Sequence, residues 1–531
     1  MLKKSLISLF TIIAIIAQAG ITYANPNAMT PLQVLPQNLD MVLNLDLKQS
    51  PEITNTFKQF TSNENESIKE LIDIGKRNEI IAGFRGVDKN NEIRDMFMSV
   101  KVSNGQFKTI TNSYGSSSGL EALGEIVDYK CTKTKDVCFA KLGTYFYLTN
   151  RASNMDELVM NFTKGERDVL NQNKEYMNSQ NLKVFGSYIS AYLDFKWINK
   201  EILKAFENPY RSELSDLVTN MVKSLNYEGF SMSTNDIRTS GRLYIEHNNM
   251  MKNLSFAYSD FMFNPDLYNY VDAKNMIFYT ESSNLAKRMS ILNNAIDDEF
   301  GDEMKEVLRL FEIMDTNMAF STRYVEGDLV PRITLMAELK RNNKNKAKDV
   351  LENLIGQIKE TTKAQDDWYK EMGMENPNQV EIRTIKSDLY EITISLDDDS
   401  VLALGVDDIT IKFGINESGI LIASNDETAG IIHNNARTNF LKNVKGPINS
   451  VGTAFIDFKS LSSYIDKLEN KYPTIGSEEQ TINTLNKLDF MSIHAYAGLN
   501  WLKVDFNITY EWGDTLESLL KGLESGLFLP E

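Results

Sequence analysis

Strand-like alternation that opens in the same way at two places constrains this chain more than any other feature. In residues 40–50, DMVLNLDLKQS, the apolar side chains of Met41, Leu43 and Leu45 alternate with polar ones. Residues 275–283, NMIFYTESS, open in a similar way. Alternation with a period of two is typical of a β-strand with one buried face, so each segment predicts a strand.

Three further pairs of segments follow in the same order. Each pair shares one local pattern: a strand with an Asn-containing turn, a strand that leads into a helix, or two strands joined by a turn with Gly. The pairs are YFYLTNRASNMDELV (145–159) with GILIASNDETAGII (419–432), SAYLDFKWINK (190–200) with TAFIDFKSLSS (453–463), and FSMSTNDIRTSGRLYIEHN (230–248) with FMSIHAYAGLNWLKVDFNITYEW (490–512). The number of residues between the two members of a pair differs from pair to pair, as insertions in one half would cause. We predict two similar halves, residues 30–250 and 265–515, within a chain of 531 residues.

Each half combines alternating strands with amphipathic segments of helical period. Residues 349–362, DVLENLIGQIKETT, place Leu351, Leu354 and Ile358 at helical spacing. Residues 103–105, Ser-Asn-Gly, follow an alternating run and predict a hairpin turn. These patterns predict an α+β fold, in which each half is an antiparallel sheet with helices packed on one face.

The N-terminus has the order of a secretory signal. Lys3 and Lys4 precede an apolar run over 6–16, and small residues follow, so cleavage after Ala19 or Ala24 fits. We expect residues 1–24 to be a signal peptide and the mature chain to be periplasmic or secreted; a retained membrane anchor is the alternative. The net charge of −17 argues against a nucleic-acid partner.

The two cysteines predict a local disulfide. Cys131 and Cys138 lie in CTKTKDVC, where polar residues between them suggest a hairpin tip, and an exported chain meets an oxidising compartment. A redox pair is the weaker alternative because the spacing is not C-x-x-C. A metal site is weaker still, since no His or second pair of cysteines is near in sequence.

No catalytic or cofactor motif emerges from the residues. His247, His433 and His494 are far apart in sequence and are interpreted as ordinary strand or surface residues. The Gly/Ser-rich segment 114–120, YGSSSGL, lacks the lysine and spacing of a phosphate loop and predicts a flexible loop. We therefore expect no catalytic residue, no cofactor and no metal.

Several charged features have both a functional and a structural interpretation. The acidic clusters 297–303 and 397–400 could bind a divalent cation, although neither matches an EF-hand loop, and we interpret them as solvated turns. The basic run 340–349 is a helix entry or, alternatively, a docking patch. Asp194 and Asp457, the matching acids of LDFK and IDFK, could form a paired carboxylate site. The alternative is that each caps the following helix or pairs with Lys196 or Lys459.

The strand-to-helix openings carry a family resemblance. LPQNLDMVLNLDLKQSPEITNTF, from Leu35, and AYLDFKWINKEIL, from Ala191, resemble an uncharacterised bacterial family of exported or membrane-anchored proteins of unknown function. The resemblance implies an envelope location and no particular activity.

Two classes of function agree with these expectations. The first is an exported envelope protein with a non-catalytic binding or structural role and an envelope protein as partner. The second is a carrier of a lipid or other apolar ligand, suggested by apolar strand faces and 22 methionines, which fill adaptable surfaces. An enzyme of unrecognised type is a third possibility.

Overall fold

A computed structural model describes residues 29–46, 78–87, 93–108, 120–123, 129–132, 137–164, 168–196, 219, 223–235, 237–248, 266–283, 313–339, 343–376, 379–386, 388–397, 400–401, 405–433, 439–444, 450–471, 479–498 and 500–510. The predicted signal peptide, residues 1–24, lies outside this part. The chain forms two compact units. The first unit comprises Met1–Ala205, Leu225–Asn248 and Trp512–Glu531, and the second comprises Phe206–Ser224 and Asn249–Glu511. Within the described ranges, no helix is both long and apolar enough to cross a membrane.

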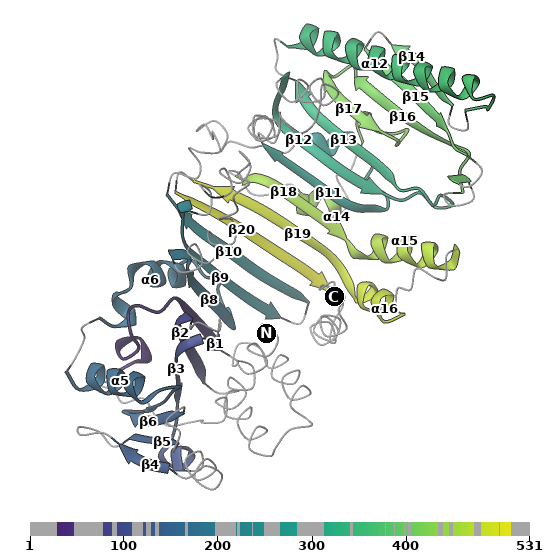
Figure 1. Cartoon of the computed structure of the whole chain (residues 1–531). Helices are drawn as coiled ribbons and strands as arrows, with labels where there is room; N and C mark the ends of the chain where they lie inside the picture. Colours follow the sequence, from purple (N-terminus) through teal and green to yellow (C-terminus); the bar gives the residue numbers. More distant parts are fainter. Residues whose placement is uncertain are drawn as a thin grey trace. The chain divides into compact units, whose positions relative to one another are not determined.

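The first unit contains ten described strands in an antiparallel sheet, and most of them can be followed in Figure 1. They are β1 (Met41–Asp46), β2 (Glu79–Val87), β3 (Ile93–Lys101), β4 (Leu120–Leu123), β5 (Tyr129–Thr132), β6 (Cys138–Leu142), β7 (Tyr145–Thr149), β8 (Ile189–Asp194), β9 (Leu225–Asn235) and β10 (Arg238–His247). Their order is β4-β5-β6-β7-β3-β2-β1-β8-β9-β10. The helical elements are η1 (Pro31–Gln33), α5 (Ala152–Lys164), η3 (Leu170–Gln172) and α6 (Lys174–Asn181).

The second unit also contains ten described strands in an antiparallel sheet. They are β11 (Met276–Ser283), β12 (Met314–Arg323), β13 (Arg332–Leu339), β14 (Val380–Lys386), β15 (Leu389–Ser395), β16 (Asp408–Ile415), β17 (Ile420–Ser424), β18 (Ser450–Asp457), β19 (Leu488–Ala497) and β20 (Trp501–Tyr510). Their order is β14-β15-β16-β17-β13-β12-β11-β18-β19-β20. The helical elements are η5 (Leu267–Tyr270), α12 (Lys344–Glu371), α14 (Asn439–Val444), α15 (Phe458–Lys471) and α16 (Glu479–Lys487).

Antiparallel sheets with separate helices define the α+β class, so the predicted fold class is confirmed. Position for position, the strand order of the second unit follows that of the first. The four pairs of similar sequence segments fall on strands at the same positions of this order: β1 and β11, β7 and β17, β8 and β18, and the hairpins β9–β10 and β19–β20.

Two hydrophobic clusters cover the two faces of the first sheet. On one face, Met155 and Leu158 of α5 and Tyr176 of α6 pack with Val42 and Tyr192. The other face is a separate cluster that includes Ile80, Met98 and Phe146 of three neighbouring strands. Burying a large apolar side chain stabilises a fold by about 1.5–3 kcal/mol, so these clusters hold the sheet together.

The second unit packs helices on both faces of its sheet, so the expectation of helices on one face is wrong there. On β17, Leu421 packs with Leu351 and Leu354 of α12. Its neighbour Ile422 points to the opposite face and packs in the cluster that holds Phe440 of α14. The sequence indicates this in the apolar run Ile420–Ile422, which is buried throughout. In a strand with one solvated face, apolar and polar residues would alternate instead.

The hairpin predicted at residues 103–105 is also wrong. Residues 104–108 are helical, and β3 pairs with β2 and β7 instead. Ser103 caps this turn: its hydroxyl accepts from the Gln106 N–H at 3.3 Å, and the Gln106 side chain accepts from the Ser103 N–H at 2.8 Å. This reciprocal pattern is a capping box, and the Ser-x-x-Gln spacing carried that signal in the sequence.

The predicted disulfide is confirmed. Cys131 and Cys138 are bonded and lie directly opposite each other on β5 and β6. Both are fully buried.

Candidate functional site

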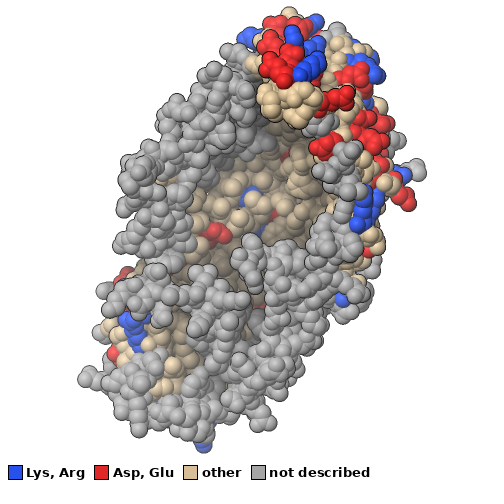
Figure 2. All heavy atoms as spheres, turned by 45° about the vertical axis from the view of Figure 1, so that its right-hand side comes forward, with Lys and Arg blue, Asp and Glu red and all other residues tan. Residues whose placement is uncertain are grey.

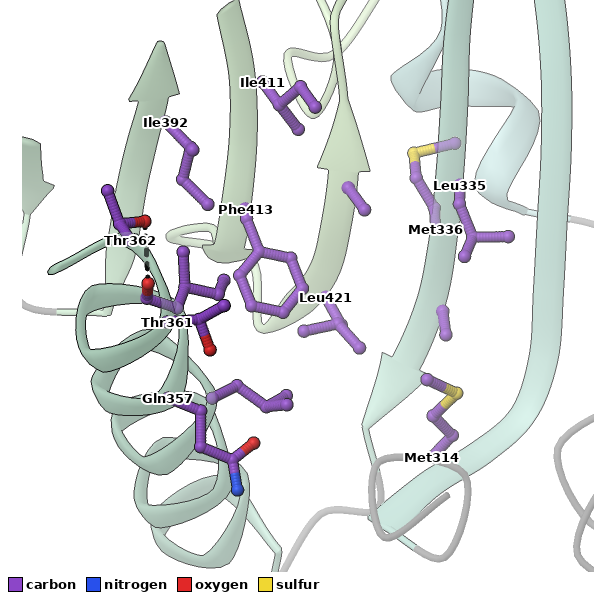
Figure 3. Close-up of a pocket in the computed structure, with 14 residues that line it drawn as sticks. Met314, Leu335, Met336, Gln357, Thr361, Thr362, Ile392, Ile411, Phe413 and Leu421 are labelled. Carbon is purple, nitrogen blue, oxygen red and sulfur yellow. Dashed lines mark hydrogen bonds between the residues drawn. The ribbon is translucent and has the colours of Figure 1, made fainter. Parts of the chain in front are cut away.

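The second unit contains an apolar cavity of about 540 Å³ between α12 and its sheet (Figure 3). Cavities that bind small molecules usually measure about 300–1,000 Å³, so this one is large enough for a ligand. The lining comes from α12 and five adjacent strands: Met314, Leu335, Met336, Ala337, Leu354, Gln357, Ile358, Thr361, Thr362, Ile392, Ile411, Phe413, Leu421 and Ala423.

The sheet supplies an apolar floor because alternate residues of its strands face α12. Ile392, Phe413 and Leu421 contribute from β15, β16 and β17, and Leu335 and Met314 continue the lining on β13 and β12. These five strands are neighbours in the order β15-β16-β17-β13-β12. Four spacings between strands span about 19 Å, so the floor is long enough for an extended chain molecule.

The helix supplies a wall through residues at helical spacing. Leu354, Ile358, Thr361 and Thr362 repeat at intervals of three, four and seven or eight residues and lie on one side of α12. The Thr362 hydroxyl donates to the carbonyl of Ile358 at 2.8 Å, so that hydroxyl is satisfied within the helix (Figure 3). Gln357 and Thr361 are exposed, and they mark where the cavity meets solvent.

The lining decides what the cavity can do. Among the described residues, none of the fourteen that line it is charged or carries an imidazole or thiol. Such a lining offers no general base to activate its threonine hydroxyls and no carboxylate, imidazole or thiolate to bind a metal, and its binding energy comes from removing apolar surface from water. A charged group on a ligand would have to remain at the exposed rim, because burying an unpaired charge is costly.

The outer face of α12 is charged. Figure 2 shows acidic and basic side chains gathered over α12 and the neighbouring edge of its sheet, at the top of the view. The described part of the basic run, residues 343–349, forms the start of this helix. Lys348 lies 3.4 Å from Asp388 and 3.9 Å from Glu352. The helix is therefore amphipathic, with its apolar side toward the cavity.

Asp194 and Asp457 each bind the backbone that follows their strand. The Asp457 carboxylate accepts from the Ser460 N–H at 2.9 Å and so caps α15, as the structural alternative predicted. The Asp194 carboxylate accepts from the Lys196 N–H at 2.8 Å, and the Lys196 ammonium lies 3.9 Å away. The Lys459 ammonium lies 2.8 Å from Asp489, so of the two structural alternatives for Asp457 the structure shows the helix cap.

The three histidines are each described in their own unit. His247 is fully buried in the first unit. In the second, His433 Nε2 lies 3.1 Å from the carbonyl of Thr428, and His494 Nδ1 lies 3.2 Å from the hydroxyl of Thr453. Burial lowers the pKa of His494, partly offset by the nearby Asp505 carboxylate.

The acidic clusters form no metal centre where they can be seen. The Asp397 carboxylate accepts from the Ser400 N–H at 2.7 Å, which closes a local turn. Residues 297–303 lie outside the described ranges, as do residues 114–119 of the Gly/Ser-rich segment. Among the residues that the structure describes, no group of His, Cys, Asp and Glu could hold a metal ion.

Sequence reasoning missed a pair of asparagines with matching roles. The Asn150 side chain follows β7, accepts from the Met96 N–H at 2.9 Å and donates to the Arg94 carbonyl at 2.9 Å. The Asn425 side chain follows β17, accepts from the Ile333 N–H at 2.5 Å and donates to the Pro331 carbonyl at 3.0 Å. In each unit, the asparagine side chain thus makes the two hydrogen bonds that a neighbouring strand would otherwise make with the backbone at the start of β3 or β13. The signal was the Asn that both turn sequences carry.

A matching pair of arginines was also missed. Arg85, near the end of β2, makes a bidentate ion pair with Glu157 of α5 at 2.9 and 3.1 Å. Arg323, at the end of β12, binds both oxygens of Asp426, one of them at 2.7 Å. Burial would raise the pKa of Asp426, but the Arg323 guanidinium and Thr428 outweigh it and lower the pKa. Each arginine attaches the segment after β7 or β17 to the sheet.

A buried acid on β11, Glu281, has a strongly raised pKa. Glu281 is fully buried; it accepts from the Tyr279 hydroxyl and from the N–H groups of Asp266 and Leu267 at 2.9 and 3.2 Å. Burial raises its pKa to about 7, although these hydrogen bonds oppose the shift. The side chain therefore caps η5 from inside the core. It does not line the cavity.

Comparison with known proteins gives little. No protein-family model matches the chain, and no curated protein matches it. This outcome is consistent with the uncharacterised family indicated by the sequence. Solved structures titled crystal forms I and III of TP0453 match at 12% and 13% identity with a TM-score of 0.29; they cover 43% and 42% of this chain and 87% and 81% of their own. A likeness at that TM-score assigns no function.

Proposed function

We propose that the protein is an exported, non-catalytic binding protein that carries an apolar ligand in the cavity of its second unit. The observation that supports this most is the lining: fourteen uncharged residues around about 540 Å³, with exposed polar side chains only at the rim. An apolar cavity of this size stabilises a ligand that removes hydrocarbon from water, at about 25 cal/mol for each Å² buried.

The shape of the site favours a long hydrocarbon chain. The floor crosses five adjacent strands, and the wall follows one side of α12. An unbranched acyl chain could lie across these strands with its polar end near Gln357 and Thr361. The bacterial envelope, which we propose as the location from the N-terminal sequence, is rich in such molecules.

We also propose that the two units are copies of one ten-stranded folding unit. The common strand order supports this proposal, and so do the four sequence pairs that fall on corresponding strands. Asn150 and Asn425 make the same two hydrogen bonds at corresponding places, which an unrelated pair of sheets would rarely reproduce. The apolar cavity lies in the second unit, where α12 follows β13, the third strand of that unit.

Titration with a fluorescent fatty acid, cis-parinaric acid, tests the carrier function. The delipidated wild-type protein should bind it saturably at one site. Ala423→Phe should weaken binding at least tenfold, because Ala423 lines the cavity and the added ring would occupy it. Ala495→Phe, the same change at a partly buried position of β19 outside the lining, is the matched control. Absence of saturable binding, or equal affinity in all three proteins, would contradict the proposal.

A further inference from the structure

The packing of α12 changes abruptly at Gly356. All four fully packed residues of this helix precede the glycine: Ala347, Leu351, Leu354 and Ile355. From Gln357 to Glu371 every side chain is half-buried or exposed. Trp368 is 52% exposed, although a residue of this size is usually well buried. The first half is thus part of the core, and the second half is held only weakly by the sheet.

Gly356 itself has no structural requirement. Apart from the adjoining backbone of α12 and the two neighbouring residues, a Cβ atom at this position would meet no atom within 4 Å, and the backbone is not in the left-handed region that favours glycine. In a helix interior, glycine is less favourable than every residue except proline, because its backbone has the most conformational freedom to lose when the helix forms. The sequence therefore weakens α12 at the junction between its packed and unpacked halves.

The two ends of α12 differ. Its N-cap, Asn343, makes no side-chain capping bond, and the first turn holds no acid. At the other end, the Gly373 N–H donates to the Lys370 carbonyl at 3.0 Å and the Met374 N–H donates to the Tyr369 carbonyl at 2.9 Å, which together form a Schellman cap. The second half is therefore closed at its own C-terminus and can move as one helical segment, whereas deep burial fixes only the first half.

The weakly held half is the half that lines most of the cavity wall. Gln357, Ile358, Thr361 and Thr362 all follow Gly356, and only Leu354 precedes it. A bend at Gly356 would move these four side chains away from the floor while the packed half stayed in place. We propose that residues 357–371 of α12 are a movable wall hinged at Gly356, which opens to admit an apolar chain. This inference rests on the proposed carrier function, since the wall borders that cavity.

Amide hydrogen exchange of the ligand-free protein tests the hinge independently of any ligand. Amides of 357–371 should exchange faster than those of 347–355 in the wild type. Gly356→Ala should slow exchange of 357–371 about fivefold, the factor expected from the difference in helix propensity, and should leave 347–355 unchanged. Gly105→Ala, in the short helix of the first unit where a Cβ would also be unobstructed, is the control and should leave α12 unchanged.

Stopped-flow release of cis-parinaric acid then links the hinge to the site. Gly356→Ala should slow release by a similar factor. Equal protection on both sides of Gly356 in the wild type would overturn the hinge, and so would an equal slowing of both halves in the variant. If the wild type fails to bind the probe, the carrier function falls, whereas the exchange data still decide whether the hinge exists.

Discussion

Glu281 gives the second unit a stability that depends on pH, and Glu281→Gln should remove this dependence. The carboxyl group is fully buried on β11 and takes three hydrogen bonds, from Tyr279, Asp266 and Leu267. A glutamine has the same shape; its carbonyl can accept from the two backbone N–H groups, and its NH₂ can donate to the Tyr279 oxygen. The variant therefore imitates the protonated acid at every pH.

The expected size follows from the pKa. Burial raises the pKa of Glu281 from 4.5 to about 7. Below about pH 4.5 the acid is protonated in both the folded and the unfolded state, so Glu281 does not lower the free energy of unfolding. As the pH rises toward 7, the unfolded chain loses the proton while the folded chain keeps it, and folding weakens. Above pH 7 the loss levels off at about 3 kcal/mol, from about 1.4 kcal/mol for each pKa unit.

Urea unfolding between pH 4 and pH 8.5, followed by circular dichroism, measures this difference. The free energy of unfolding of Glu281→Gln minus that of the wild type should rise by about 3 kcal/mol across the range. Other ionisable groups titrate in both proteins and cancel. Glu360→Gln, an exposed residue of α12, controls for the loss of one carboxyl group and should show a flat difference. A flat difference for Glu281→Gln as well would refute the buried, proton-holding acid.

Two further predictions concern the sheets. Replacing Cys131 and Cys138 together by Ser should lower the free energy of unfolding of the first unit by about 2–3 kcal/mol in a urea titration, because the disulfide closes a short loop; a loss below about 1 kcal/mol would contradict the expectation. Asn150→Ala and Asn425→Ala should each cost about 1–2 kcal/mol by the same assay, because each leaves a strand N–H without its amide partner. A cost in only one unit would contradict their matching roles.

The sequence predicts the strands well because alternation reflects the local pleat of each strand. Met41–Asp46 alternates and is a strand, and the similar opening at Met276–Ser283 falls on the corresponding strand of the second unit. The alternation does not show which faces are covered, because both faces of the first sheet are packed and the polar Asn44 of β1 is buried. The disulfide was also predictable, since the two cysteines are close in sequence and lie on adjacent strands. By contrast, the Asn-Gly pair after Ser103 predicts a hairpin, whereas these residues follow a capping box and begin a short helix. Which of the two forms depends on the strands that pair with β3, and these are distant in sequence.

The candidate site could not be predicted because its residues are scattered. The cavity lining runs from Met314 to Ala423, and each residue reads in sequence as an ordinary core position. Which of them leave space depends on how α12 packs against the sheet, and packing of this kind has no local pattern. Glu281 was missed for a related reason, because its burial is set by η5 and the neighbouring strands.

Native mass spectrometry of the mature protein, prepared from the cell envelope without detergent, tests the carrier function most directly. A single adduct of lipid-like mass should appear on each chain and should be removed by organic extraction. The Ala423→Phe variant should lack this adduct, and the Ala495→Phe variant should retain it. A protein with no adduct in the wild type, or an adduct that Ala423→Phe retains in full, would contradict a ligand held in the cavity between α12 and its sheet.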